Sequence, residues 1–173
     1  KIGAAVIKNL SGFGCRILAS DIRENPSLKG LCTYVDNETL YKACDIISLH
    51  MPLLESTRHF VNAETIARMK DGVTIINCAR GELMNIPDMI RGIETQKIGA
   101  LALDVFDKED GIYHENRRDD ILSNRDMAYL RQFPNVLLTN HIAFYTDVDV
   151  DSMIEQGIAN IVAMDRGVCA TEL

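Results

Sequence analysis

Apolar and polar residues follow two different spacings along the chain. Residues 2–10 place apolar side chains three or four positions apart, a spacing that predicts an amphipathic helix. Further helices are predicted where a capping residue or an early proline precedes a similar pattern, at 37–44, 63–69, 87–95 and 147–166. Short apolar runs predict strands at 15–20, 45–49, 73–77, 98–103 and 136–139.

The strand runs are continuous Val, Ile and Leu sequence rather than an alternation of apolar and polar residues. Such runs are typical of strands that are buried on both faces. Because strands and helices alternate in chain order, the sequence predicts an α/β fold with a doubly wound parallel sheet. The segment 106–124 is long, charged and aperiodic, which is typical of a functional loop.

Composition narrows the class of protein. A chain of 173 residues with 47% hydrophobic residues can bury one sizeable core. The net charge of −7 gives no bulk attraction for nucleic acid or for an anionic membrane, and no apolar run is long enough to cross a bilayer. The five cysteines form no C-x-x-C pair, which favours reduced thiols in a cytoplasmic protein. No histidine or acidic spacing indicates a metal site.

Residues that follow the predicted strands are the first candidates for a site, because ligands of open α/β sheets bind beyond the carboxyl ends of the strands. In chain order these residues are Asp21, His50-Met51-Pro52, Cys78-Ala79-Arg80, Asp104 and His141. Packing alone does not require two acids, an arginine and a histidine at successive strand ends. The pattern therefore predicts a ligand site along this edge.

Two features indicate a dinucleotide. Lys1-Ile2-Gly3 fits the last three positions of G-x-G-x-x-G at a helix start. Asp21 closes the next strand, where an acid binds the hydroxyls of the adenosine ribose. A carboxylate there would repel a 2′-phosphate, so the sequence favours NAD over NADP.

Five ordered segments together resemble the D-2-hydroxyacid dehydrogenase family, and within it most closely the D-lactate dehydrogenase branch. They are DIRENP, DIISLHMP, TIINCARGEL, LALDVFDKEDGIYHE and NVLLTNHIAFYT. The resemblance covers nearly the whole chain and implies a Rossmann-like NAD-binding domain. It also implies the reversible reduction of a 2-oxo acid by NADH, with pyruvate and D-lactate as the expected pair. The catalytic residues that it implies are Arg80, Glu109 and His141.

Chemistry explains why these three residue types suit the reaction. A guanidinium such as that of Arg80 can hold the substrate carboxylate with charge-assisted hydrogen bonds and polarise the adjacent carbonyl. Histidine titrates near neutrality, so His141 can donate the proton in one direction and accept it in the other. A carboxylate such as that of Glu109 can orient the imidazole and stabilise its charged form.

The resemblance also implies a set of cofactor contacts. Lys1, Ile2 and Gly3 would lie at the pyrophosphate and Asp21 at the ribose, with the remaining contacts made by Met51, Pro52, Thr57, Cys78, Ala79, Arg80 and Asp104. Cys78 invites a second hypothesis, as a nucleophile beside His141. A small thiol at a strand end is more typical of packing.

In this family the substrate domain is built largely from an N-terminal region, which this chain does not include. We therefore predict a fragment: residues 1–146 form the dinucleotide-binding domain, without its first strand and first two glycines, and 147–173 form a C-terminal helix and tail. The fragment alone is expected to have negligible turnover, and the family suggests a homodimer. Asn140 and Ile142 depart from the family pattern, which has proline or serine before the histidine and a smaller residue after it.

Two functions from different classes remain open. The first is the enzyme, with a 2-oxo acid as substrate. The second is a non-catalytic NAD(H)-sensing module that binds other proteins through the same fold. Arg80, Glu109 and His141 together favour the enzyme. Another Rossmann enzyme, such as a methyltransferase, would not explain all three.

Overall fold

The computed structural model of the chain describes residues 1–109, 111–113 and 124–165. The chain divides into two compact units, Lys1–Asn140 and His141–Leu173. The domain boundary expected at residue 146 falls inside the second unit and stays a prediction. Part of the expected functional loop, at 110 and 114–123, lies outside the described residues.

Helices α2 to α5 each begin at a capping side chain. The first unit contains α1 (Ile2–Leu10), α2 (Asn37–Ala43), α3 (Ala63–Arg68), α4 (Ile86–Glu94) and α5 (Arg125–Leu130). Asp36 accepts a hydrogen bond from the Thr39 N–H at 2.7 Å and so caps α2. Asn62 and Asn85 cap α3 and α4 in the same way. Single 3₁₀ turns lie at Ser11–Phe13, Pro26–Leu28, Glu55–Thr57 and Gly81–Leu83.

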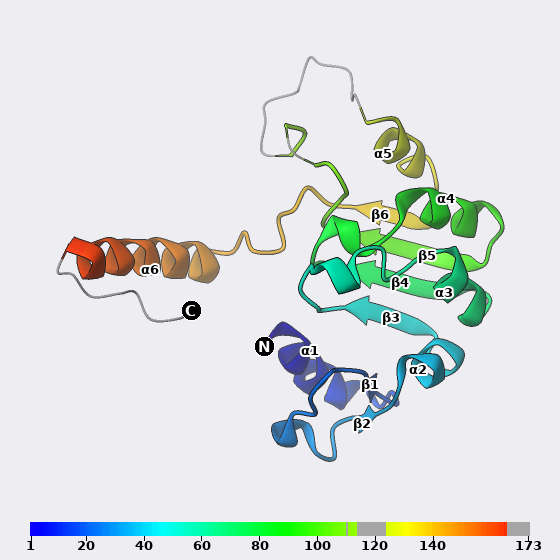
Figure 1. The fold of residues 1–173 in the computed structure, drawn as a ribbon, viewed down its shortest axis with the longest axis horizontal. Coiled ribbons are helices and arrows are strands. Elements are labelled where there is room, and N and C mark those ends of the chain that lie inside the picture. The colour runs from blue at the N-terminus through cyan, green and yellow to red at the C-terminus, as the bar shows by residue number, and fades with distance from the viewer. Residues whose placement is uncertain (110, 114–123, 166–173) are drawn as a thin grey trace. The chain divides into compact units, whose positions relative to one another are not determined.

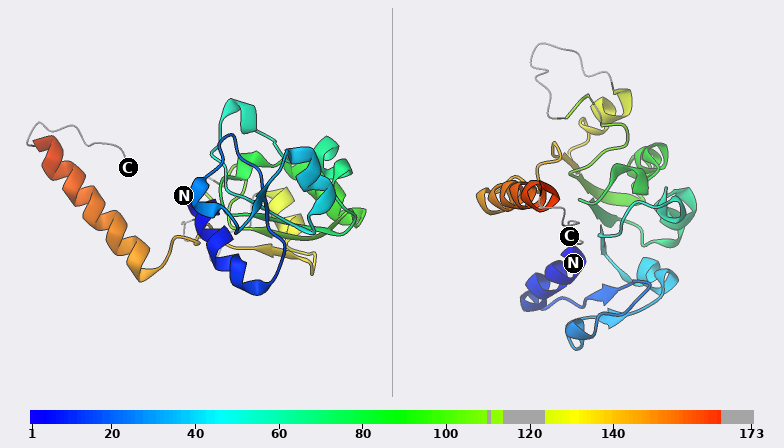
Figure 2. Two further views of the ribbon diagram at one scale, coloured as in Figure 1. Left: turned by 90° about the horizontal axis from the view of Figure 1, so that it is seen from below. Right: turned by 60° about the vertical axis from the view of Figure 1, so that its left-hand side comes forward.

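All strand pairs of the described chain are parallel, which agrees with the predicted α/β fold. β1 (Leu18–Ala19) pairs with β2 (Thr33–Tyr34) in a small sheet. A four-stranded sheet has the order β3 (Ile46–Leu49), β4 (Val73–Asn77), β5 (Ile98–Leu103), β6 (Val136–Leu138). Figures 1 and 2 show the small sheet and α1 beside this larger sheet. The strand predicted at 15–20 is only two residues long, and β2 and α5 were not predicted, because both are too short for a clear period.

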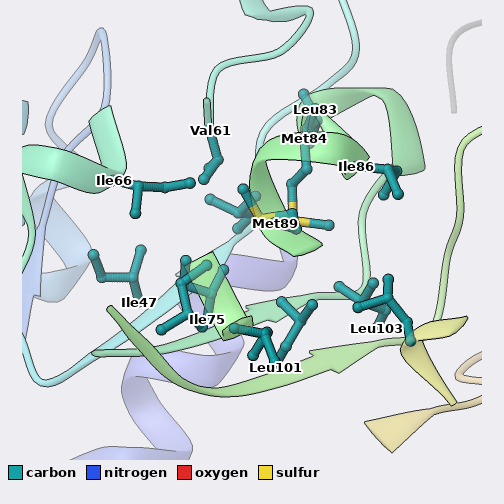
Figure 3. Close-up of a cluster of buried hydrophobic side chains, with 14 of the residues drawn as sticks. Ile47, Val61, Ile66, Ile75, Leu83, Met84, Ile86, Met89, Leu101 and Leu103 are labelled. Carbon is teal, nitrogen blue, oxygen red and sulfur yellow. The ribbon is translucent and has the colours of Figure 1, made fainter. Parts of the chain in front are cut away.

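The core lies between one face of the larger sheet and helices α3 and α4. Figure 3 shows Met89 of α4 facing Ile75 and Leu101 of the sheet, and each of these side chains is at most 1% exposed. The sheet side chains on this face alternate with less buried ones along β3 and β4. This packing fixes the four strands and therefore the positions of the loops that follow them.

The opposite face of the larger sheet is only partly covered. The strand register places Ser48, Ile76, Ala102 and Leu137 in one row across β3, β4, β5 and β6. Leu137 is 62% exposed and Ile76 is half-buried. The prediction of strands buried on both faces is therefore wrong for the described chain. Val, Ile and Leu content indicates that a strand is suited to burial, and it cannot show which segments are present to cover it.

The second unit contains α6 (Asp147–Asp165), which begins where predicted. Ile154, Ile158 and Ile161 lie on its apolar stripe, and all three are exposed. Gly167, the expected end of this helix, lies outside the described residues. Across the described helices, none is long and apolar enough to cross a membrane.

Candidate active site

The strand register brings the predicted site residues of three strands to one edge of the sheet. Leu49, Asn77 and Leu103 are paired across β3, β4 and β5, each at the carboxyl end of its strand. The residues that follow, among them Cys78 and Asp104, therefore emerge at the same edge, as expected for an α/β ligand site.

The turn after β4 carries Arg80. The side chain of Asn77 is fully buried, and its oxygen accepts a hydrogen bond from the Ala79 N–H at 2.9 Å. Its NH₂ group donates to the Arg80 carbonyl at 2.8 Å. The Arg80 side chain is exposed, and its guanidinium donates to the Ala79 carbonyl at 2.7 Å. The turn thus presents a cationic group to solvent from a backbone held by a buried amide.

The loop that carries Glu109 lies directly against the Arg80 turn. A Cβ atom at Gly81 would fall well inside 3.0 Å of backbone atoms of Phe106 and Asp107. Within the loop, the Glu109 carboxylate accepts a hydrogen bond from the Phe106 N–H at 2.8 Å. The guanidinium of Arg80 and the carboxylate of Glu109 therefore belong to two segments in backbone contact.

Asp104 joins the ends of β4, β5 and β6. Its backbone N–H donates to the Asn77 carbonyl at 3.0 Å, and its side chain is 5% exposed. The carboxylate accepts a hydrogen bond from the Thr139 hydroxyl at 2.5 Å, and the Thr139 N–H donates to the Leu103 carbonyl at 2.9 Å. A line of hydrogen bonds thus runs along the edge from the Arg80 turn to the end of β6.

Electrostatics at this edge disfavour thiolate chemistry. Solvent reaches Cys78, but desolvation by nearby protein atoms, followed by the Asp104 charge, raises the pKa of its thiol. A raised pKa keeps the thiol neutral near pH 7, whereas a nucleophilic cysteine needs a lowered one.

Burial, with a contribution from Glu109, raises the pKa of Tyr113 to about 12.

The start of α1 is where the contacts to the pyrophosphate of a dinucleotide are predicted. The N-cap residue Lys1 makes no side-chain hydrogen bond to the N–H groups of the first turn, so these N–H groups can bind an anion. Gly3 gives room to His50, since a Cβ atom at Gly3 would lie 3.2 Å from the His50 Cβ. The His50 ring is hydrogen-bonded to the Ser48 hydroxyl at 3.0 Å, and desolvation lowers its pKa.

Other expected cofactor contacts lie in the loops that follow β1 and β3. Asp21 is exposed just beyond β1, where its carboxylate accepts a hydrogen bond from the Arg23 N–H at 3.3 Å. Thr57 closes the loop after β3: its hydroxyl donates to the Pro52 carbonyl and accepts from the Leu54 N–H, both at 2.8 Å. Met51 packs against the core. As cofactor contacts, these residues stay predictions.

His141 is the first residue of the second unit, whereas Arg80, Asp104 and Glu109 belong to the first. It has a left-handed backbone with φ 53°, and its ring makes an edge-on contact with Phe144 at 6.3 Å between centroids. Its role together with Arg80 and Glu109 stays a prediction. Neither Asn77 nor Thr139 was predicted as a site residue, although Asn77 lies three positions before Arg80 in the segment TIINCARGEL.

Comparison with known proteins identifies the family. Residues 1–143 match the domain described as D-isomer specific 2-hydroxyacid dehydrogenase, NAD binding domain. The chain is 40% identical to an aromatic 2-oxoacid reductase of Clostridium sporogenes, over 99% of this chain and 53% of that protein. It is 38% identical to the D-lactate dehydrogenase of Lactobacillus delbrueckii subsp. bulgaricus, over 96% of this chain and 50% of that protein.

Solved structures agree with these relatives. The D-lactate dehydrogenase of Lactobacillus jensenii with NAD⁺ matches with a TM-score of 0.90 and 34% identity, over 99% of this chain and 52% of that one. The pyruvate reductase of Chlamydomonas reinhardtii matches with a TM-score of 0.94 and 34% identity, over 99% of this chain and 53% of that one. The chain spans about half the length of these relatives. It belongs to the D-isomer specific 2-hydroxyacid dehydrogenase family, as an NAD-binding domain of that family.

Proposed function

We propose that the full-length protein reduces a 2-oxo acid to the D-2-hydroxy acid with NADH, and that the pair is pyruvate and D-lactate. The observation that carries the proposal is the exposed guanidinium of Arg80 on a turn packed against the Glu109 loop. A cation at the carboxyl edge of an NAD-binding sheet is suited to hold the carboxylate of such a substrate beside the nicotinamide.

The residues divide the reaction between them. The hydride that reduces the carbonyl carbon of the substrate would come from bound NADH. Arg80 binds the substrate carboxylate and polarises the carbonyl, which orients the carbon that is reduced. Asp104, which is buried beside the Thr139 hydroxyl, would accept a hydrogen bond from the nicotinamide carboxamide.

Proton transfer belongs to His141 with Glu109. Negative charge develops on the carbonyl oxygen during reduction, and a protonated imidazole can neutralise it by donating its proton. Glu109 would orient the ring and stabilise its charged form. In the reverse direction the neutral imidazole accepts the proton of the hydroxy acid.

An aromatic 2-oxo acid is the second candidate substrate. Phe144 contacts the His141 ring, and Ile142 follows the histidine directly, so the segment beside the proposed acid is apolar. The 40% identity to a reductase named for aromatic 2-oxoacids supports the same possibility. The substrates to compare are therefore pyruvate and phenylpyruvate.

The experiment measures NADH oxidation and the chirality of the product for the full-length protein and for His141→Ala. We expect D-lactate from pyruvate, with kcat reduced on the order of 1,000-fold in the variant. A higher kcat/KM for phenylpyruvate would replace pyruvate by the aromatic acid. If neither acid is reduced although NADH binds, the NAD(H)-sensing module becomes the better explanation.

We further propose that the full-length protein is a homodimer and that it is cytoplasmic. Sedimentation of the full-length protein would test the first proposal, and its location in fractionated cells would test the second.

A further inference from the structure

Asn77 has an unusual position for an amide side chain. It is fully buried at the carboxyl end of β4. Burying such a group without hydrogen-bond partners would destabilise the fold. Both of its polar atoms are bonded, and both bonds go to the next turn: the oxygen to the Ala79 N–H at 2.9 Å and the nitrogen to the Arg80 carbonyl at 2.8 Å. The two bonds enclose the dipeptide that carries the guanidinium.

The other end of this residue is fixed by the sheet. Asn77 is paired with Leu49 on β3 and with Leu103 on β5. Its backbone carbonyl also accepts the Asp104 N–H at 3.0 Å. The side chain therefore connects a rigid part of the sheet to an exposed turn.

Arg80 depends on this connection. Its side chain is exposed, and the Ala79 carbonyl is its one hydrogen-bond partner among the residues that the structure describes. A long, exposed side chain binds a substrate with defined geometry only if its Cα atom is held in place. We infer that Asn77 is a positioning residue of the 2-oxo acid site, because its buried amide clamps the turn from which Arg80 reaches the substrate carboxylate. This inference rests on the function proposed above.

Asn77→Asp tests the clamp with almost no change in side-chain size. One oxygen can still accept the Ala79 N–H, but an ionised second oxygen faces the Arg80 carbonyl and repels it. When the introduced carboxyl is protonated, its O–H can donate to that carbonyl and restore both bonds. Burial raises the pKa of such a carboxyl, which brings this titration toward the pH range of the assay.

The expected result is a defect that acid relieves. At pH 8 we expect kcat/KM for the 2-oxo acid to fall on the order of 100-fold in the full-length variant. The ratio of variant to wild-type kcat/KM should rise as the pH is lowered toward 5. The Kd for NADH, measured by fluorescence, should change less than about threefold, because most of the proposed cofactor contacts lie elsewhere. A loss of folding alone would weaken NADH binding as well, and would not lower kcat/KM while leaving the Kd for NADH nearly unchanged.

Two further variants complete the experiment. Asn85→Asp makes the same chemical change at the cap of α4, where the side-chain oxygen accepts the Asp88 N–H at 3.2 Å. An aspartate caps equally well, so the wild-type kinetic constants are expected at every pH. Asn77→Ser is too short to bond the Arg80 carbonyl, so it should raise KM for the 2-oxo acid without relief by acid. This variant serves if Asn77→Asp does not fold.

Amide hydrogen exchange of residues 78–83 gives a measurement that needs no activity. We expect faster exchange in both Asn77 variants than in the wild type. Unchanged exchange, wild-type kinetic constants in folded Asn77 variants, or a pH-independent defect in folded Asn77→Asp would each overturn the inference. If the wild type reduces no 2-oxo acid while exchange still rises in both variants, the proposed function fails and the holding of the turn stands.

Discussion

The Arg131 guanidinium donates a hydrogen bond to the side-chain oxygen of Asn140 at 3.2 Å. Arg131 caps the end of α5, and Asn140 is the last residue of the first unit. Thr139 is still bonded to the sheet, but no backbone hydrogen bond from the Asn140 N–H is found in the described part of the chain. The arginine therefore holds the residue from which the chain leaves for His141.

Removing this bond should reduce turnover. In the full-length protein, Arg131→Met should lower kcat on the order of tenfold while the Kd for NADH stays unchanged. Adding Asn140→Pro should restore most of the loss, since proline fixes the backbone of residue 140 by its ring. Arg125→Met, which changes an arginine at the other end of α5, is the matched control. Equal kcat values for Arg131→Met and wild type would contradict the prediction.

Thr139→Val should destabilise the fold. Valine has nearly the same shape but cannot donate to the buried Asp104 carboxylate, and a bond to a charged group contributes about 1.5–3 kcal/mol. Urea unfolding at pH 7 should show a loss of about 2 kcal/mol. Thr95→Val, at an exposed helix end, should change the free energy of unfolding by less than about 0.5 kcal/mol. A similar loss in both variants would argue against a special role for the Asp104 bond.

Cys78 should react slowly with alkylating agents at neutral pH. Burial and the Asp104 charge raise its pKa, so the thiolate fraction is small at pH 7 and grows only above the usual range. Iodoacetamide labelling, followed by mass spectrometry of the peptide, should speed up with pH to a midpoint above that of an ordinary cysteine. In Asp104→Asn the midpoint should move lower. A midpoint below 8 would revive the hypothesis of a nucleophilic thiol.

Tyr113→Phe should stabilise the protein. Its hydroxyl is buried and has no hydrogen-bond partner in the structure as described. Removing it should raise the free energy of unfolding by about 1 kcal/mol. Its folded-state pKa of about 12 exceeds the usual 10, so this residue lowers stability as the pH rises from 10 to 12, and Tyr113→Phe should lack that loss. Tyr129→Phe, which removes an exposed bond to Glu94, should instead be neutral or slightly destabilising.

The sequence predicted the strands and the edge of the sheet well, because both depend on local patterns. Runs of Val, Ile and Leu placed β4 and β5 correctly to the residue, and the positions just after them marked Arg80 and Asp104. Short elements such as β2 gave no period to detect. The supporting bonds of Asn77 and Thr139 were missed because each joins segments whose proximity appears only in the fold. The burial of each sheet face likewise depends on which other segments are present.

The close packing at Gly81 limits how the substrate range of the protein can be changed. The side chain of any other amino acid at this position would push the arginine turn away from Phe106 and Asp107, and so from the segment that carries Glu109. The turn that carries Arg80 and the loop that carries Glu109 are in backbone contact, so a shift of one requires a shift of the other. Engineering should therefore alter side chains that project from this piece and leave its backbone intact, since moving either loop alone would displace a cation from the acid with which it is proposed to cooperate.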